Sequence, residues 1–376
     1  MLTTTKLNTN LFTELRKLDE VILSTYDELK QCDSDELLAI HKYALVSNIG
    51  ASTRIENALL TDPEVYWLDT VLTKDGHITA LRKNWSKIEN KLSKDRERSI
   101  EEVAGCRQML ILIYENANDF FPLRESDLRA LHQQLMEPYL KKSPYVGNYK
   151  IQSNSVFERN QHSGEERIIF KTADAGPMTN VAMSDLVQWY NDVQMLDSLS
   201  IVVACEFVYR FLAIHPFQDG NGRLSRGLFL LALLQSSYLT LSFVAQFLAI
   251  DRAIEKHKLE YYDVLNRCSD GKFSQDPHLY KMEHFIQFML KILQEALADI
   301  LYYRKKYLAV KQLSESGIKI LECFEDNPEI RLKTKDLREK TGLPRRTINN
   351  ILVKLLDAKL IQQYGRGAAS RYQITF

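Results

Sequence analysis

The feature that most constrains this 376-residue chain is an apolar helical stretch that leads directly into a short polar run. Residues 199–214 are apolar on nearly every side of the predicted helix, which is typical of a helix at the centre of a bundle. The twelve residues that follow, 215–226, have the sequence HPFQDGNGRLSR and overlap the start of another helical pattern over residues 222–237. The polar run therefore connects the end of one buried helix to the beginning of the next.

Part of this run has the composition of a phosphate-binding turn. Gly220 and Gly222 flank Asn221 and let the backbone adopt positive φ and approach a ligand closely. Because the turn opens a helix, its free N–H groups and the positive end of the helix dipole favour an anion such as a phosphate. Arg223 and Arg226 are one helical turn apart, so both guanidinium groups can face neighbouring phosphates.

The other two polar side chains of the run indicate a reaction. Asp219 is a hard oxygen ligand beside the turn, suited to Mg²⁺ that bridges two phosphates. His215, with a free pKa of about 6.5, can accept a proton from a hydroxyl at physiological pH. The pattern predicts phosphoryl or nucleotidyl transfer to an alcohol, catalysed by positioning and charge stabilisation. A histidine before proline, or an Asp-Gly-Asn-Gly turn, has a purely structural explanation on its own, but their ordered combination favours a functional site.

The spacing of apolar residues elsewhere in the chain predicts a mainly α fold. An N-terminal helical region is expected over residues 1–115, followed by a catalytic core over residues 116–305. The charged stretch 87–102 is expected to be a solvated helix face or connection. Residues 144–177 are rich in turn formers and include a β-like run over residues 167–172. The remaining predicted helical segments of these two regions are 11–30, 35–46, 62–72, 103–114, 126–136, 181–193 and 278–303.

The last part of the chain, residues 312–376, differs from the rest in charge and in pattern. Residues 331–376 contain eleven Lys and Arg against three Asp and Glu, a net charge of +8 in a chain whose total is zero. Three short helical segments and two β-like runs joined through a glycine-containing turn predict a winged helix-turn-helix. These five segments are residues 318–324, 334–340, 345–359, 360–364 and 370–375.

The third of these helices is the one that a winged helix-turn-helix presents to base edges in the major groove. The positive charge of the region favours a nucleic-acid partner, although winged helices also serve as protein-interaction or dimerisation modules. The residues expected to contact DNA are Arg345, Arg346, Thr347 and Asn350 on the helix, and Arg366 and Arg371 on the hairpin.

The run 215–226 also resembles the motif of the Fic family, HxFx(D/E)GNGRxxR, at every fixed position. The similarity extends over roughly residues 125–300 and includes Leu131-His132 and residues 146–150, in which Lys150 replaces the usual arginine. The resemblance implies a Fic-type helical bundle with a β-hairpin flap. It also implies a protein adenylyltransferase that uses ATP and Mg²⁺ to transfer AMP to a Ser, Thr or Tyr hydroxyl of a target protein.

The same resemblance implies a role for each site residue. His215 would activate the target hydroxyl, Asp219 would bind Mg²⁺, and Arg223 and Arg226 would bind the outer phosphates. An unaltered Gly222 favours AMP transfer, because the branch of the family that transfers phosphate has a different residue there. The other implied ligands are Gly220, Asn221 and Gly222 for the α-phosphate, Ile168, Ile169, Phe170 and Lys171 for the target segment at the flap, and Tyr261 and Tyr262 for adenine, two tyrosines that packing explains equally well.

Residues 52–57, STRIEN, match a second Fic pattern, [ST]xxxE[GN], which lies on an inhibitory helix N-terminal to the core in class II of the family. Ser52, Glu56 and Asn57 occupy its fixed positions. We expect Glu56 to pair with Arg226, reversibly, because dehydration of such a pair offsets much of its Coulomb gain. The structural alternative is a solvent-facing glutamate. In some relatives the same glutamate serves the removal of AMP, so deAMPylation is an alternative function.

Composition indicates the class of protein and the compartment in which we expect it. Its 45% hydrophobic and 26% charged residues are typical of an ordered soluble chain. Five scattered cysteines indicate reduced thiols rather than a disulfide framework. We recognise no secretory signal and no apolar run long enough to span a bilayer, so we expect a cytoplasmic protein. The sequence fixes neither the target protein nor whether the chain forms a homodimer. A DNA-binding regulator with a nucleotide-sensing Fic domain is the alternative from another functional class.

Overall fold

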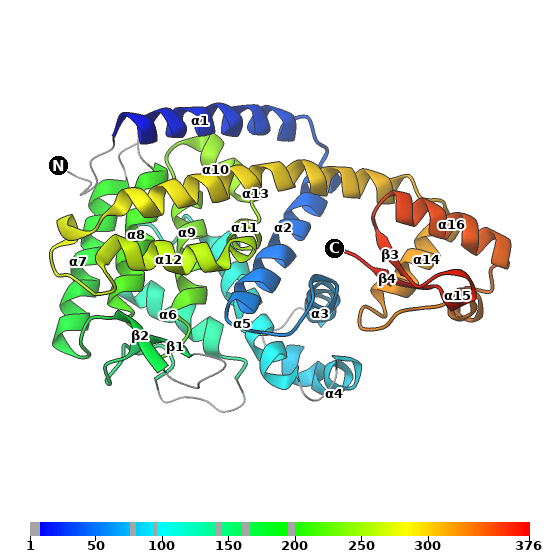
Figure 1. Ribbon diagram of the computed structural model, residues 1–376, viewed down its shortest axis with the longest axis horizontal. Helices are drawn as coiled ribbons and strands as arrows, with labels where there is room; N and C mark the ends of the chain where they lie inside the picture. Colours follow the sequence, from blue (N-terminus) through cyan, green and yellow to red (C-terminus); the bar gives the residue numbers. More distant parts are fainter. Residues whose placement is uncertain (1–7, 76–79, 93–95, 140–144, 160–165, 195–199) are drawn as a thin grey trace.

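The computed structural model describes residues 8–75, 80–92, 96–139, 145–159, 166–194 and 200–376 (Figure 1). In these ranges the protein is mainly helical, as predicted, with two small antiparallel sheets. One continuous hydrophobic core extends from Leu11 in α1 (Thr9–Leu29) to Tyr303 in α13 (Met282–Lys311). The first six residues, in which no secretory signal is recognised, lie outside the described ranges.

The second helix, α2 (Ser34–Ile55), is longer than the amphipathic segment 35–46 predicts. The Asp33 side chain accepts a hydrogen bond from the Glu36 N–H (2.8 Å) and caps the first turn. The second half of α2 is buried on nearly all sides, so its sequence has no apolar stripe to mark it as a helix. As a result Ser52 lies on the last turn of α2, and Glu56 is its C-cap residue. The helices that follow are α3 (Asp62–Asp75), α4 (Ala80–Leu92) and α5 (Glu97–Asn116).

The expectation of a solvated stretch over residues 87–102 is wrong for its last part. Helix α5 begins there, and Glu102 is only 4% exposed, with its carboxylate paired to Arg98 (3.0 Å). The physical reason is the close packing of α5 on α6 (Glu125–Met136), where a side chain at Gly105 would overlap the carbonyl group of Leu135. Charge density alone did not reveal this packing.

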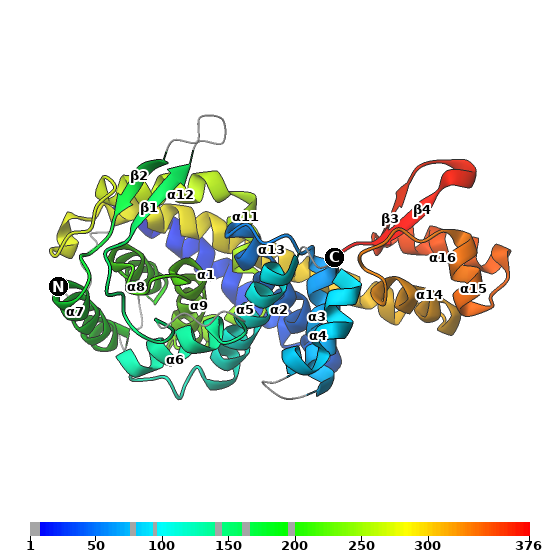
Figure 2. The ribbon, with the colours of Figure 1, turned by 90° about the horizontal axis from the view of Figure 1, so that it is seen from below.

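The centre of the bundle is α8 (Ser200–Ile214), which is buried nearly all round, as predicted, and packs along α9 (Asn221–Leu234). Helix α13 runs along the part of the molecule that precedes the C-terminal module (Figures 1 and 2). It packs on α1, α2, α8, α11 (Ile250–Lys256) and α12 (Lys258–Ser269). The other elements of this part are β1 (Ser155–Arg159), β2 (Glu166–Lys171), α7 (Pro177–Gln194) and α10 (Leu239–Ala245).

The C-terminal part has its own hydrophobic core and follows α13 directly. It contains three helices and then an antiparallel hairpin in which Ile361 pairs with Ile374, the element order predicted for a winged helix-turn-helix. In Figures 1 and 2 it lies at the opposite end of the molecule from the β1–β2 hairpin. Its elements are α14 (Glu315–Glu325), α15 (Thr334–Thr341), α16 (Arg345–Asp357), β3 (Ile361–Tyr364) and β4 (Arg371–Ile374).

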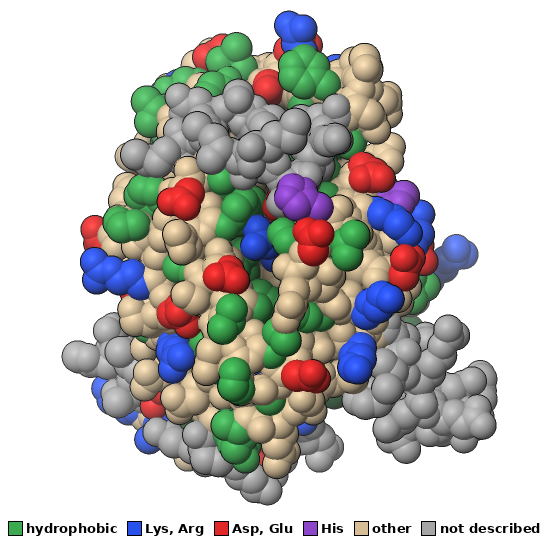
Figure 3. All heavy atoms as spheres, turned by 90° about the vertical axis from the view of Figure 1, so that its left-hand side faces the viewer, with side chains coloured by type: hydrophobic (Ala, Val, Ile, Leu, Met, Phe, Trp, Pro, Cys, Tyr) green, Lys and Arg blue, Asp and Glu red, His purple; other side chains and the backbone are tan. Residues whose placement is uncertain are grey.

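One face of the molecule, at the end away from this C-terminal part, shows no patch of charge of a single sign among the residues described (Figure 3). On the face shown in Figure 3, acidic and basic side chains are interspersed among the hydrophobic ones. None of the helices in the described ranges combines the length and the hydropathy needed to cross a lipid bilayer.

Candidate active site

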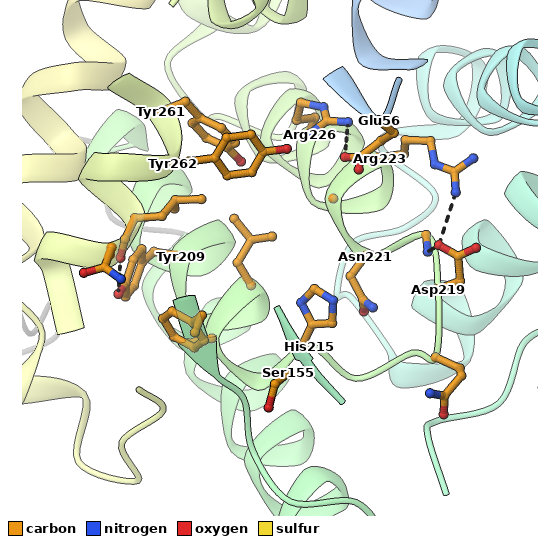
Figure 4. A pocket seen from close by; sticks show the side chains of 18 residues that line it. Glu56, Ser155, Tyr209, His215, Asp219, Asn221, Arg223, Arg226, Tyr261 and Tyr262 are labelled. Carbon is orange, nitrogen blue, oxygen red and sulfur yellow. Dashed lines mark hydrogen bonds and ion pairs between the residues drawn. The ribbon is translucent and has the colours of Figure 1, made fainter. Parts of the chain in front are cut away.

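A cavity of about 300 Å³ lies where α8 ends and α9 begins (Figure 4). The C-terminal end of α2, the β1–β2 hairpin and α12 complete its wall. The cavity thus brings together residues that are up to about two hundred positions apart in the sequence. Of the predicted site residues, it is lined by Glu56, Phe170, His215, Asp219, Gly220, Asn221, Gly222, Arg223, Arg226, Tyr261 and Tyr262.

The turn between α8 and α9 is held by its own side chains. Gly220 has φ +81° and is the N-cap of α9, a conformation that disfavours any other residue. The side chain of Asn221 accepts a hydrogen bond from the Phe217 N–H (2.9 Å) and donates one to the Phe217 carbonyl (2.7 Å). Asn221 therefore fixes the turn with its side chain, and any contribution to anion binding comes from its backbone N–H, which the first helical turn leaves free.

A second histidine, His132, packs against this turn. The ring of His132 is stacked on Phe217, with ring centres 3.9 Å apart. Its Nε2 is 3.0 Å from the carbonyl oxygen of Asp219, and its Nδ1 accepts a hydrogen bond from the Gly147 N–H (3.0 Å). Burial lowers the pKa of His132 to about 4, so the ring is neutral and donates through Nε2. The sequence marks His132 as part of a family pattern but does not reveal this role.

His215 is the last residue before the turn, and its ring points into the cavity (Figure 4). Its backbone N–H donates to Phe211 at the end of α8 (2.9 Å), and its φ is +53°. Burial, followed by the nearby charge of Lys150, lowers the pKa of His215 to about 4. This corrects the expectation of an ordinary histidine pKa: the imidazole is neutral, and able to accept a proton, throughout the physiological range.

Lys150, the lysine in place of the usual arginine, joins the end of α8 to the base of the β1–β2 hairpin. It is buried, and its Nζ donates to Asn154 (2.9 Å), Thr172 (3.0 Å) and the carbonyl oxygen of Ile214 (3.0 Å). Burial without a carboxylate contact lowers the pKa of Lys150 to about 8. The residue positions the backbone of the neighbouring histidine and was not predicted to do so.

The predicted flap residues lie on β2, antiparallel to β1, with Ile168 paired to Phe157. Ile169 lies in the same strand, and the side chain of Phe170 lines the cavity. The backbone of Lys171 is paired on its other edge, since its N–H donates to Gly271 and its carbonyl accepts from Phe273 (both 2.8 Å). The backbone of Lys171 is therefore already used within the chain, and its side chain is exposed.

Arg223 is 2% exposed but is not fully satisfied. One terminal nitrogen donates to the Tyr139 hydroxyl, and the other lies 3.5 Å from an oxygen of Asp219. Its Nε has no hydrogen-bond partner among the described residues, which is costly for a buried charged group. Asp219 is exposed, and a lone accessible carboxylate beside an anion site fits Mg²⁺ that is bound largely by substrate phosphates.

Glu56 contacts Arg226, as expected from the sequence: their side chains are 3.0 Å apart, from Oε1 to Nη2. The same carboxylate lies directly in front of the first turn of α9, because a Cβ atom on Gly222 would be 2.4 Å from Glu56 Oε1. Ser52 accepts two further hydrogen bonds from Arg226, through its hydroxyl (3.0 Å) and its carbonyl (2.8 Å). Asn57, with φ +73°, ends the motif and accepts a hydrogen bond from Lys258 (3.2 Å).

The two tyrosines of α12 differ in exposure. Tyr261 is 3% exposed and packs against Phe288, with ring centres 5.9 Å apart, so the packing explanation holds for most of its surface. Tyr262 is half-buried and presents its ring to the cavity (Figure 4). Sequence reasoning assigned no site role to several other lining residues, although Gln218 lies in the 215–226 run and three others lie on the predicted helix 199–214. These residues are Ser155, Tyr209, Leu212, Ala213, Gln218, Leu265 and Asn266.

The predicted nucleic-acid residues all lie in the C-terminal part, away from the cavity. On the first turns of α16, Arg345, Arg346 and Asn350 are exposed and Thr347 is half-buried. Arg366 and Arg371 are exposed on the β3–β4 hairpin. The structure thus brings this second set together on one module.

In comparisons with known proteins, the model of the Fic/DOC family matches residues 122–233, which lie within the predicted catalytic core. Two curated relatives, each named protein adenylyltransferase Fic, come from Aedes aegypti and Culex quinquefasciatus. They are 21% and 26% identical to this chain over 68% and 52% of its length. The aligned parts are only 46% and 35% of those proteins, so the chain spans less than half of their length.

Solved structures extend the likeness to the fold. A Fic family protein from Desulfovibrio desulfuricans has a TM-score of 0.57 and 22% identity, over 99% of this chain and 97% of that one. A Fic domain containing signaling protein from Bacteroides thetaiotaomicron has a TM-score of 0.56 and 22% identity, over 77% of this chain and 97% of that one. The predicted mainly helical, Fic-type fold is thereby confirmed.

Proposed function

With a Fic/DOC family domain at residues 122–233 as the premise, we propose that this protein is an adenylyltransferase that Glu56 keeps inactive. It transfers AMP from ATP to a Ser, Thr or Tyr hydroxyl of a target protein. The main support is the position of the Glu56 carboxylate. It lies against Gly222 at the positive end of α9 and beside Arg226, which is where a phosphate would bind.

The residues of the cavity divide the reaction between them. A target hydroxyl attacks the α-phosphorus of ATP, the bond to the bridging oxygen breaks, and pyrophosphate leaves. The neutral His215 takes the hydroxyl proton. The N–H groups at the start of α9 stabilise the charge on the α-phosphate, while Arg223 and Arg226 bind the outer phosphates. When bound, Mg²⁺ neutralises charge on the phosphate oxygens, and Asp219 is the residue placed to hold it.

Inhibition follows from competition for Arg226. Because the glutamate carboxylate and an outer phosphate need the same guanidinium, only one of them can be bound productively at a time. The Glu56 side chain is 33% exposed, whereas that of Arg226 is 2% exposed, so the glutamate can move toward solvent while the arginine stays in place. The inhibitory motif, residues 52–57, precedes the core, and this is the arrangement of class II of the Fic family.

Replacing Glu56 tests the proposal. Glu56→Gly should raise the incorporation of label from α-³²P-ATP into the chain itself, and Glu56→Gly with His215→Ala should abolish it. Glu20→Gly, which removes an exposed glutamate of α1, is the matched control and should leave incorporation unchanged. An absence of incorporation by Glu56→Gly, with ATP binding intact, would contradict AMP transfer. Loss of label from pre-labelled protein would favour deAMPylation.

For the C-terminal module we propose a nucleic-acid partner. The support is the exposure of five of the six predicted contact residues together with the net charge of +8 over residues 331–376. A gel-shift titration from low to moderate salt tests it. Absence of binding at low salt would favour a protein partner instead.

A further inference from the structure

Arg226 has a second carboxylate neighbour that sequence reasoning did not find. Asp251, in the first turn of α11, is 4% exposed, and its Oδ2 lies 3.8 Å from Nε of Arg226. The Ser52 hydroxyl also accepts a hydrogen bond from Arg226 Nε (3.0 Å). The buried guanidinium therefore has Asp251 as an ion-pair partner in addition to Glu56.

Asp251 is itself fixed by α2. Its backbone N–H donates to the side chain of Asn48 (3.0 Å), and the amide of Asn48 donates to the carbonyl oxygen of Leu248 (2.8 Å). All of these groups are buried. The segment that carries Asp251 is thus attached to the same helix that carries Ser52 and ends at Glu56.

The two carboxylates beside Arg226 differ in how freely they can leave it. The side chain of Asp251 is 6% exposed, against 33% for Glu56. A buried charge that loses its only partner is strongly destabilised. If Glu56 were the sole partner, its departure would leave Arg226 uncompensated before a nucleotide arrives. Asp251 removes this difficulty because it stays in place.

We propose that Asp251 is a positioning residue of the phosphate site. As an ion-pair partner of Nε, it holds Arg226 with its terminal nitrogens toward the cavity, both when Glu56 is bound and when a nucleotide phosphate replaces it. This inference rests on the proposed function and deepens it, because it separates a removable counter-charge from a permanent one. As a consequence, a change at Asp251 should weaken the binding of the outer phosphates and leave the binding of the adenosine part unchanged.

Nucleotide binding to the Glu56→Gly protein tests the proposal. Titration calorimetry at pH 7.5 would compare ATP with AMP, which lacks the outer phosphates. Burial raises the pKa of Asp251 to about 6, so its carboxylate is charged at this pH. Adding Asp251→Ala should weaken ATP binding about tenfold, as expected for loss of one buried ion pair, and leave AMP binding unchanged. Asp263→Ala, which removes an exposed carboxylate of α12, is the matched control.

The outcomes separate the two claims. If the Glu56→Gly protein binds no ATP, the proposed function fails and this inference fails with it. If that protein binds ATP and Asp251→Ala changes ATP and AMP binding equally or not at all, only the inference fails. Should Asp251→Ala not fold, Asp251→Asn takes its place. In that case the Tm loss for Glu56→Gly with Asp251→Asn should exceed the sum of the two single losses, because Arg226 loses both charges. Additive losses would overturn the inference.

Discussion

Helices α9 and α16 each contain two arginines near their N-terminal ends, but the two pairs have opposite exposure. Arg223 and Arg226 are 2% and 4% exposed, and side chains from other parts of the chain contact both. Arg345 and Arg346 are exposed to solvent at the start of α16. The residue type is the same, but Arg223 and Arg226 are the third and sixth residues of α9, whereas Arg345 and Arg346 are the first two of α16. The packing around the two pairs also differs.

This difference determines what each helix can recognise. A buried guanidinium has few positions available, so it favours a ligand whose charges match its fixed geometry, such as a triphosphate. An exposed one keeps its hydration and its freedom, and it attracts any polyanion with a strong dependence on salt. The core is therefore suited to chemistry on one small molecule, and the module to a large and variable partner.

The largest expected effect is on the rate of self-labelling. In the Glu56→Gly background, His215→Ala should lower self-labelling by about 10²–10⁴-fold, the usual contribution of a general base. Labelling by Arg345→Ala with Arg346→Ala should stay within about twofold, because these residues lie outside the cavity. Initial rates with labelled ATP measure both. Retention of most activity after His215→Ala would contradict the assignment of His215 as the general base.

The next effect is on stability. Arg226→Ala should cost about 3–5 kcal/mol, because it leaves the buried carboxylate of Asp251 without its partner. Arg345→Ala should change stability by no more than about 0.5 kcal/mol. The three tryptophans, Trp67, Trp85 and Trp189, all precede the module, so urea unfolding followed by their fluorescence reports on the core. Equal costs for the two arginines would show that burial does not distinguish them.

A smaller effect is expected in the pH dependence of the free energy of unfolding. The pKa values of His132 and His215 are both lowered to about 4, mainly by burial, and residues 315–376 contain no histidine. The unfolded chain takes up these protons near pH 6.5, whereas the native core does so only near pH 4. The free energy of core unfolding should therefore fall as the pH drops through this window. NMR titration of labelled histidines measures the two pKa values directly, and values near 6.5 would contradict the assigned burial.

The smallest effect on the folded protein is expected from the module, where salt dependence is the sensitive measurement. If Arg345 and Arg346 each contact a phosphate, replacing both with alanine should lower the slope of log K against log salt by about 2. Fluorescence anisotropy with a labelled duplex gives this slope. Lys335→Ala, on the exposed side of α15, is a control for total charge. An unchanged slope in the double variant would exclude the start of α16 as the contact surface.

The parts of this structure that were predictable are those fixed by local spacing. The HPFQDGNGRLSR run predicts the turn and the start of α9. Two β-like runs joined through a glycine-containing turn predict the β3–β4 hairpin. In each case neighbouring residues contain enough information to define the element.

The parts that were not predictable depend on packing between distant segments. Asp251, Tyr139 and Lys150 contact the site from separate elements, and no spacing in the sequence relates them to the turn. The low pKa of His215 depends on burial and on the charge of Lys150, neither of which the local sequence reveals. The full length of α2 was missed because a helix buried on all sides has no polar face.

The central claim is that the start of α9 binds a triphosphate in the position that Glu56 occupies. A crystal structure of the Glu56→Gly protein with Mg²⁺ and a non-hydrolysable ATP analogue tests it most directly. We predict that the α-phosphate lies against the N–H groups of residues 221–223, with an outer phosphate within hydrogen-bonding distance of Arg226. A cavity without nucleotide, or a triphosphate that points away from α9, would contradict the account.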